Sequence, residues 1–318
     1  MNLLASLRYL VALNEHRHFA RAAQSCHITQ PALSNALRAL EKEYGTPIVK
    51  RGRSYAGLTP EGELVLATAQ RMLHEHAWLQ QELHSGAERP QGALRLGVVP
   101  TAVPVAARFA AMLQARHPGI APVVLALSSQ EIETGLDQLA LDLGLGFVER
   151  LSQRGARLAA LPQYSERYFL VRRAASAARA QRRQLRLGQA MPWREAADLP
   201  LCLLTPDMHN RSIVDAAFAK VGATIKPVME TNSTLTLTLS LSAGELCSVL
   251  PGALVATLRG QGELEARPLV EPDITTSVGF MTAAQARPPR ALQAALVLAR
   301  DAQWLSDVRS HSGTLFSD

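Results

Sequence analysis

The stretch "CHITQPALSNALRALEKEYG", residues 26–45, decides the fold of the amino-terminal part of the chain. Its leucines recur at the spacing of one buried helix face: Leu33, Leu37 and Leu40. Thr29 is a favourable N-cap, and Pro31 lies in the first turn, where its missing N–H costs no hydrogen bond. The opposite face begins with small uncharged polar residues and becomes basic further on. The pattern predicts a short helix whose outer face suits a polar surface.

Two shorter helices are predicted upstream of this stretch, over residues 3–14 and 19–27. Two helices joined by a short turn form the helix-turn-helix motif. After Gly45, the segment "TPIVKRGRSYAGLT" predicts a β-hairpin wing made of two short strands. The residues expected at the tip of the wing are basic: Lys50, Arg51 and Arg53. Residues 1–58 are therefore predicted to form a winged helix-turn-helix domain.

The third helix is predicted to read DNA from the major groove. Its outer polar residues can reach base edges or phosphates: Thr29, Gln30, Ser34 and Asn35. Glutamine and asparagine can pair with adenine through two hydrogen bonds, which gives base selectivity. Arg38, together with Arg51 and Arg53 of the wing, is expected to meet phosphates, which supplies affinity and salt dependence. The alternative is a helical hairpin inside a larger core with solvated basic loops.

Residues 59–89 are predicted to form a long linker helix and a hinge, with Thr59 as the cap and Pro60 at the first helical position. Large or apolar side chains repeat at alternating spacings of four and three: Val65, Ala69, Met72, His76, Leu79 and Leu83. That rhythm is typical of a coiled-coil seam, which needs a partner chain to cover it. The alternative is an amphipathic helix that packs on its own domain.

From residue 90 onward, short apolar strands alternate with helical stretches, beginning with "LRLGVV" and "VAARFAAMLQARH". This alternation predicts an α/β domain with mainly parallel strands over residues 90–318. A basic, alanine-rich stretch within it, "RRAASAARAQRRQLRLGQ", is interpreted as a surface loop or a short exposed helix. A second nucleic-acid patch at that stretch is the alternative.

The composition favours a soluble cytoplasmic protein with an anionic partner. The chain has 318 residues, of which 47% are hydrophobic, and its formal net charge is +6. Its three cysteines are far apart and form no CxxC pair, which argues against a disulfide framework or a zinc site. The apolar start, "MNLLASLRYLVALNEHR", contains Arg8 and is interpreted as a core helix rather than a signal peptide. No uncharged apolar stretch is long enough for a membrane span.

The ordered motifs "RAA", "TQPALS", "LRALE", "LTPEG" and "GALRLGVVPT" resemble those of the LysR-type transcriptional regulators, over essentially the whole chain. The resemblance implies a winged helix-turn-helix, a dimerising linker helix and an effector domain similar to periplasmic binding proteins. The residues that it places on the DNA-contacting helix are Thr29, Gln30, Pro31, Ser34 and Arg38. Many members carry arginine after the serine that aligns with Ser34, where this chain has Asn35. We therefore expect a different operator preference.

The resemblance also implies partners and a mode of action. Such proteins form homodimers, and usually homotetramers, that bind double-stranded promoter DNA and control transcription by RNA polymerase in response to a small metabolite. The effector domain is expected to have two α/β subdomains, the first over about 90–163 plus 269–310 and the second over about 164–268. No enzyme activity, resident cofactor, metal site or membrane contact is expected.

A two-lobed α/β domain binds its ligand in the cleft between the lobes, at strand ends and helix starts. The expected effector site gathers residues that follow predicted strands: Pro100, Thr101, Ser128, Ser129, Phe147, Thr205, His209 and Asn232. Hydroxyls and free N–H groups at a helix start suit an anion such as a carboxylate. Each serine or threonine has the alternative role of a helix cap, and His209 that of a surface histidine.

Two other classes of protein fit the sequence less well. A catalytic α/β domain lacks support, because "GLGF" has no third glycine for a dinucleotide fingerprint and no GxSxG or P-loop motif occurs. His74 and His76 lie two residues apart, on different faces of a helix, so they cannot share a metal ion. A solute-binding protein with a fused helical module would need an export signal, which the sequence does not show.

Overall fold

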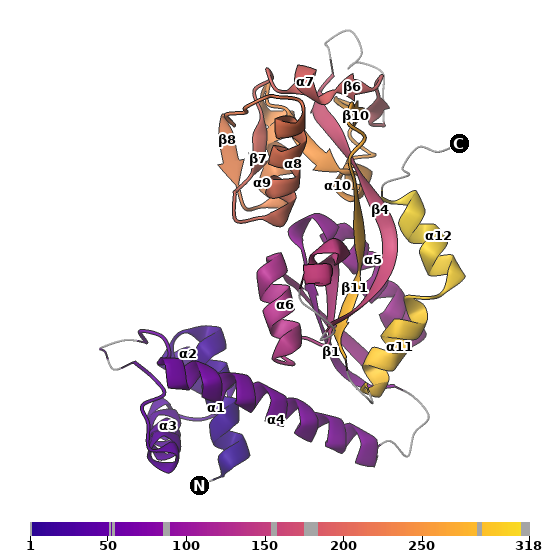
Figure 1. Ribbon diagram of the computed structural model, residues 1–318. Coiled ribbons are helices and arrows are strands. Elements are labelled where there is room, and N and C mark those ends of the chain that lie inside the picture. The colour runs from indigo at the N-terminus through magenta and orange to yellow at the C-terminus, as the bar shows by residue number, and fades with distance from the viewer. Residues whose placement is uncertain are drawn as a thin grey trace. The chain divides into compact units, whose positions relative to one another are not determined.

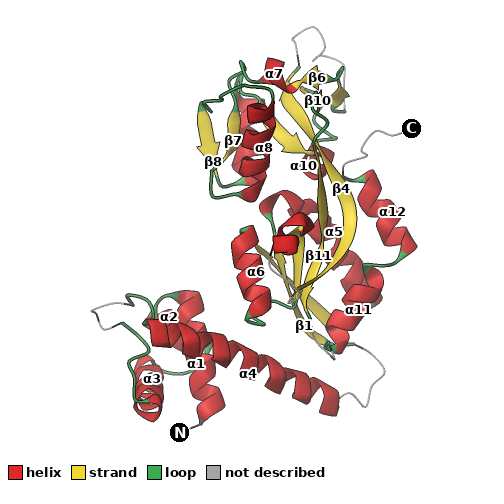
Figure 2. Ribbon diagram, in the orientation of Figure 1, coloured by secondary structure: helices red, strands yellow, loops and turns green. Residues whose placement is uncertain are grey.

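The computed structural model describes residues 2–50, 52, 55–84, 90–153, 158–174, 184–284 and 288–312. The chain divides into two compact units, Met1–Glu88 and, for the most part, Arg89–Asp318. Figure 2 shows that the first unit is helical and that the second combines strands and helices. Each unit has a hydrophobic core of its own, so the predicted α/β class with an amino-terminal helical domain is confirmed.

The first unit begins with three short helices: α1 (Leu3–His16), α2 (Phe19–Ser25) and α3 (Gln30–Tyr44). They share a core of leucines and alanines: Leu7, Leu10, Leu13, Ala22, Ala23, Leu33, Leu37 and Leu40. The predicted cap of α3 is confirmed, because the Thr29 hydroxyl accepts a hydrogen bond from the Ala32 amide at 3.4 Å. Gly45 ends the helix with a φ of 67°, a left-handed conformation that glycine adopts without strain.

The hairpin after α3 corresponds to the predicted wing. In its described part, Val49 and Leu58 form an isolated antiparallel bridge in place of the two short strands that the sequence predicts. The Glu41 carboxylate of α3 accepts hydrogen bonds from the amides of Ile48 at 2.9 Å and of Val49 at 3.1 Å. Since a charged acceptor makes a stronger hydrogen bond than a neutral one, this carboxylate fixes the base of the wing to α3.

The long helix α4 (Pro60–His84) follows the wing, as the sequence predicts. Thr59 caps it, because its hydroxyl accepts a hydrogen bond from the Gly62 amide at 2.9 Å. None of the described helices, α4 included, has the length and apolar character that crossing a bilayer requires.

The predicted seam of α4 divides into two halves. Ala69 is fully buried in the core of its own unit, so the prediction of a partner-facing position is wrong for this residue, whereas Val65 packs against that core but stays partly exposed. The alternative, packing on the same domain, holds there. Further along, Met72 and Leu79 keep 38% and 47% of their surface exposed. The second half of α4 therefore presents apolar side chains that its own unit does not cover.

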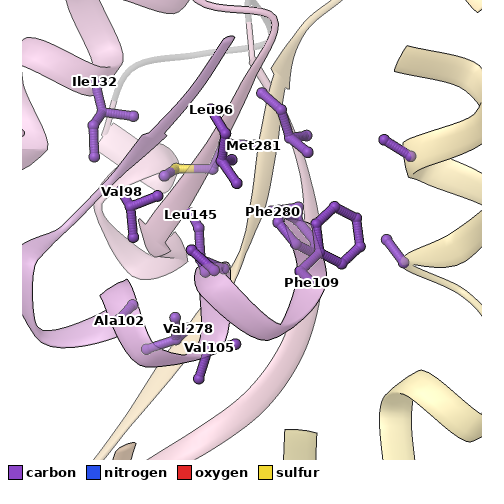
Figure 3. Packing of buried hydrophobic residues seen from close by; sticks show 14 of the residues in the cluster. Leu96, Val98, Ala102, Val105, Phe109, Ile132, Leu145, Val278, Phe280 and Met281 are labelled. Carbon is purple, nitrogen blue, oxygen red and sulfur yellow. The ribbon is translucent and has the colours of Figure 1, made fainter. Parts of the chain in front are cut away.

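The second unit begins with a lobe built on three strands. β1 (Gly92–Val98) pairs in parallel with both β2 (Ile120–Ala126) and β3 (Leu143–Phe147). The helices of this lobe are α5 (Val103–Arg116), α6 (Ser129–Asp137), α11 (Arg290–Leu298) and α12 (Ala302–Ser310). Figure 3 shows the core of this lobe, where the ring of Phe109 in α5 packs against Phe280 with 4.4 Å between ring centroids.

The second lobe has strands of mixed direction. Its strands are β5 (Arg186–Leu187), β6 (Met191–Pro192), β7 (Cys202–Leu204), β8 (Met229–Thr231), β9 (Ser248–Pro251) and β10 (Leu264–Val270). Its helices are α7 (Trp193–Ala196), α8 (His209–Lys220), α9 (Thr234–Ala243) and α10 (Gly252–Thr257). β7 and β8 are parallel, whereas β9 and β10 pair with β4 in antiparallel fashion. β10 also pairs in parallel with β5 and β6, so this lobe mixes parallel and antiparallel strands.

Two long strands, β4 (Leu158–Arg173) and β11 (Thr275–Ala283), run antiparallel to each other through both lobes (Figure 1). Their register shifts at Gln163, because Val278 pairs with Tyr164 whereas the next residue of β11 pairs with Pro162. The Gln163 side-chain oxygen accepts a hydrogen bond from the Trp304 indole at 2.6 Å. A bulge of this kind bends a strand, and here it lies where the predicted boundary between the subdomains falls.

A buried acid lies in the same crossing strand. Glu166 is 2% exposed, and its carboxyl accepts a hydrogen bond from the Ala253 amide at 3.2 Å. Burial raises the pKa of Glu166 from 4.5 to about 8, against the lowering effect of this and other hydrogen bonds. Glu166 is therefore mostly an uncharged carboxylic acid at neutral pH.

Candidate DNA-binding surface and effector cleft

The outer face of α3 carries most of the residues predicted to contact DNA: Thr29, Gln30, Pro31, Ser34, Asn35 and Arg38. All of them are exposed except Ser34, which is half-buried. The Arg38 guanidinium donates a hydrogen bond to the Asn35 side-chain oxygen at 3.3 Å, so these two side chains lie together one turn apart. Arg51 and Arg53, predicted for the wing, lie outside the described residues. This face has the small polar start and basic continuation that a major groove can accept.

A second feature of the first unit is an apolar groove of about 180 Å³ formed by α1, α3 and α4. The residues that line it are Leu7, Tyr44, Leu64, Val65, Thr68, Ala69 and Met72. Leu64 and Tyr44 keep 69% and 43% of their surface exposed. A contiguous exposed apolar patch on a soluble protein marks an interaction site.

The second unit has a narrow cleft between its lobes, with about 10 Å³ of free space. The residues that line it are Val99, Pro100, Thr101, Ser128, Ser129, Phe147, Leu204, Met208, His209 and Asn210. Pro100 and Thr101 belong to η1 (Pro100–Ala102), a short helical turn that leads into α5. Two residues predicted for the effector site, Thr205 and Asn232, are not among the lining residues.

Helix starts face this cleft from both lobes. The turn η1 leads into α5, α6 begins at Ser129 and α8 begins at His209, and residues at each of these three starts line the cleft. The first N–H groups of a helix lack partners within it and carry the positive end of its dipole. Ser128 has the cap role, because its hydroxyl accepts from the Glu131 amide at 3.3 Å while the Glu131 carboxylate accepts from the Ser128 amide at 2.8 Å. The arrangement favours a ligand that accepts hydrogen bonds.

Two buried polar side chains in the cleft lack hydrogen-bond partners. Ser129 is 8% exposed and Asn210 is 5% exposed; the Ser129 hydroxyl has no hydrogen-bond partner, and the Asn210 side-chain nitrogen lies near the buried Tyr168 hydroxyl without a well-formed hydrogen bond. A buried donor without a partner costs on the order of 1–3 kcal/mol. Such groups are expected where a ligand supplies the missing acceptor. From the sequence, Asn210 is visible only as a residue between a predicted strand and a predicted helix. Its burial results from the packing of α8, which the sequence alone does not show.

An ion pair reaches the cleft from the segment η2 (Val148–Gln153), which follows β3. The Arg150 guanidinium donates to the Glu133 carboxylate at 2.7 and 3.4 Å, and it contacts the Nδ1 atom of His209 at 3.3 Å. The His209 ring also packs edge-on against Phe147, with 5.0 Å between ring centroids. Burial and the charge of Arg150 lower the pKa of His209, while Glu133 opposes this shift. His209 is therefore a neutral ring at neutral pH, in contact with both lobes.

The thiols of the second unit are poorly placed for redox chemistry. Cys202 and Cys247 are buried, and burial raises the pKa of each thiol, which disfavours the reactive thiolate. Cys247 is the bridge partner of Leu201, so Cys202 is offset from Cys247 by one residue in the strand register. Cys247 belongs to one hydrophobic cluster of this lobe and Cys202 to another, on the opposite face of the sheet. Because successive side chains of a strand point to opposite faces, these thiols cannot join without rearranging the strands.

A winged helix-turn-helix followed by a two-lobed α/β domain with a cleft between its lobes is the architecture of a DNA-binding regulator with a ligand-binding-type domain. Residues 4–63 match the model of the bacterial regulatory helix-turn-helix protein, lysR family, and residues 87–304 match the LysR substrate binding domain. The chain belongs to the LysR family of transcriptional regulators. It is therefore a DNA-binding regulator and not an enzyme.

Similar proteins include activators of hydrogen peroxide-inducible genes. The hydrogen peroxide-inducible genes activator of Pectobacterium carotovorum subsp. carotovorum is 34% identical over 143 residues, and this match covers 45% of the chain and 47% of the relative. The DNA-binding transcriptional dual regulator OxyR of Escherichia coli K12 is 26% identical over 287 residues, 87% of this chain and 88% of the relative. The solved structure of a full-length OxyR variant from Pseudomonas aeruginosa has a TM-score of 0.69 at 25% identity and covers 93% of this chain and 97% of that chain.

Proposed function

We propose that this LysR-family regulator binds its operator as a homodimer through α3 and changes its DNA binding when a small carboxylate enters the cleft between the lobes. The observation that carries the effector part is the meeting of three helix starts around the partnerless side chains of Ser129 and Asn210. No resident cofactor or metal ion is part of this proposal.

A dimer is supported by the exposed apolar half of α4. Met72 and Leu79 lie seven residues apart, so they share one face of the helix. Met72 also lines the groove around Leu64 and Tyr44, and these exposed side chains form the candidate surface for a second copy of the chain. Two copies would present two recognition helices, which suits an operator with two half-sites.

The DNA-reading role of α3 has a direct test in Asn35→Ala. A good pair of hydrogen bonds to a base discriminates by roughly 1–3 kcal/mol, so we expect the affinity for a selected operator to fall about tenfold or more. Affinity for a scrambled duplex should change by less than about twofold, because phosphate contacts remain. Fluorescence anisotropy, with an operator enriched from a random library by the wild-type protein, measures both.

The matched control is Gln80→Ala, which removes an exposed side-chain amide from α4 instead of α3. It should leave both affinities unchanged. Equal losses on the operator and the scrambled duplex in Asn35→Ala would contradict base reading by this residue.

A carboxylate is supported by the electrostatics of the cleft. The starts of α6 and α8 offer N–H donors and positive dipole ends, and the side chains of Ser129 and Asn210 can add two donors. The free space of about 10 Å³ is roughly the room that one water molecule needs, so the lobes must move apart to admit a carboxylate. A disulfide between Cys202 and Cys247 is disfavoured by the burial of both thiols and by their placement in different hydrophobic clusters.

A thermal-shift screen of small carboxylates, each paired with its neutral amide, tests the effector class. A bound carboxylate at about a hundred times its Kd should raise the Tm of the protein by roughly 5 °C. Ser129→Ala should weaken that binding about tenfold, because a hydrogen bond to a charged group is lost.

The control variant for this screen is Ser248→Ala, because Ser248 is also a buried serine whose hydroxyl lacks a partner but lies outside the cleft lining. It should bind the carboxylate like the wild type. If a neutral amide binds as tightly as the matching carboxylate, the proposal that the cleft selects an anion is contradicted.

A further inference from the structure

The contact between Arg150 and His209 determines which ring nitrogen carries the hydrogen. Arginine has only donors, so the Nδ1 atom of His209, 3.3 Å from the guanidinium, must be the acceptor. A neutral imidazole with Nδ1 as acceptor carries its hydrogen on Nε2. The remaining polar atom of the ring is therefore a donor.

The anchor of this contact is buried. Glu133 in α6 is 2% exposed, and its carboxylate holds the Arg150 guanidinium through two hydrogen bonds. The charge of Arg150 is thereby balanced by Glu133 within the first lobe. Phe147 restricts the plane of the His209 ring from the same side of the cleft. The ring, which belongs to α8 of the second lobe, is held by residues of the first lobe.

We propose that Arg150 and Glu133 are positioning residues that keep His209 in its Nε2–H form, so that this ring donates a hydrogen bond to an acceptor oxygen of the ligand. This proposal rests on the proposed carboxylate-binding role of the cleft. It adds a statement of which carboxylates the cleft should prefer. The ligand is held by neutral donors, namely His209, Ser129 and Asn210, rather than by an unpaired cationic side chain. A monocarboxylate is thus favoured over a dianion of similar size.

Paired substitutions of His209 separate the two ring nitrogens. Glutamine places an amide N–H near the position of Nε2, whereas asparagine reaches only as far as Nδ1. We expect His209→Gln to bind the carboxylate identified by the thermal-shift screen within about threefold of the wild type, and His209→Asn to bind about tenfold or more weakly. Isothermal titration calorimetry on the full chain measures both, and circular dichroism checks that α8 remains folded. Equal binding by the two variants would overturn the donor role.

A second readout needs no ligand. In ¹H–¹⁵N NMR spectra of the ligand-free protein, His209 should show the Nε2–H tautomer at pH 7 and should take up a proton only below the ordinary histidine pKa of about 6.5. The charged groups that face the ring are Arg150 and Glu133, which act on this pKa in opposite directions. In Arg150→Lys, a cation remains beside the buried Glu133. The lysine ammonium is a single point charge without the planar fork of a guanidinium, so it cannot bind Glu133 and His209 at the same time. This variant should lose the tautomer preference.

The outcomes separate the two proposals. A wild-type protein that binds no carboxylate but shows the Nε2–H tautomer would overturn the proposed effector class and, with it, the donor role of His209. A wild-type protein that binds a carboxylate but shows the Nδ1–H form would overturn the positioning role of Arg150 alone. An unchanged tautomer in Arg150→Lys would also overturn that role.

Discussion

Leu79→Asp is expected to convert the protein from dimers to monomers and to lower its operator affinity by roughly a hundredfold. Leu79 keeps 47% of its surface exposed and lies one heptad beyond Met72 on α4. A carboxylate at a position buried between two helices would lose its hydration without gaining a partner. Because each monomer then binds one half-site only, the gain from linking two binding events disappears. Sedimentation velocity and anisotropy on the operator measure the two effects.

The control for this variant is Gln80→Asp, which adds the same charge one residue along and about 100° around the helix. It should remain dimeric. A dimer that persists in Leu79→Asp would place the interface between copies elsewhere than on this face of α4.

Glu166→Gln is expected to stabilise the protein at pH 8 and to flatten its pH dependence. The pKa of Glu166 is raised from 4.5 to about 8 by burial, so between these values the folded state holds a proton that the unfolded chain has lost. The stability of the wild type therefore falls as pH rises through this range, by roughly 5 kcal/mol in all. Glutamine has no such proton to lose, so its advantage over glutamate grows with pH.

Urea unfolding followed by tryptophan fluorescence at several pH values measures this effect, because Trp193 and Trp304 are fully buried in the same unit. Glu263→Gln is the control, since Glu263 is exposed. It should follow the wild-type curve. A difference between Glu166→Gln and the wild type that stays constant from pH 5 to about 8 would contradict a raised pKa for Glu166.

The sequence predicts the helical unit well because its signals are local. Thr29 as a cap, Gly45 as the helix end and the leucine spacing of α3 all lie within one stretch. The assignment of the α4 seam was wrong in part because spacing alone cannot tell which chain covers an apolar face. Ala69 has the same periodicity as Leu79, yet only Ala69 packs on its own unit.

Helix α9 shows a second limit of sequence patterns. Its sequence "TLTLTLSLSA" alternates with a period of two, which is typical of a strand, yet it forms a helix capped by the Ser233 hydroxyl. Leu237 and Leu241, four residues apart, are buried, whereas Leu235 and Leu239 are exposed. Tertiary packing of one helical face overrides the alternating pattern here.

The cleft was predictable as a region because strand ends and helix starts are visible in the sequence. Six of the predicted residues line it, whereas Thr205 and Asn232 do not, since the position of a residue after a strand does not determine where its side chain points. Glu133 and Arg150 were not predicted at all. They lie 17 residues apart and meet His209 only through the packing of the lobes, so no local spacing marks them.

The attachment of the wing to α3 limits how this regulator can transmit a signal. Because the Glu41 carboxylate binds the amides of both Ile48 and Val49, the base of the wing is anchored to α3, and we expect the two to move together. We therefore expect a ligand to change the separation or the angle between two DNA-binding units rather than the tilt of α3 against its wing. The response should then appear as altered curvature of the bound duplex or altered tolerance for half-site spacing, with the preferred bases unchanged.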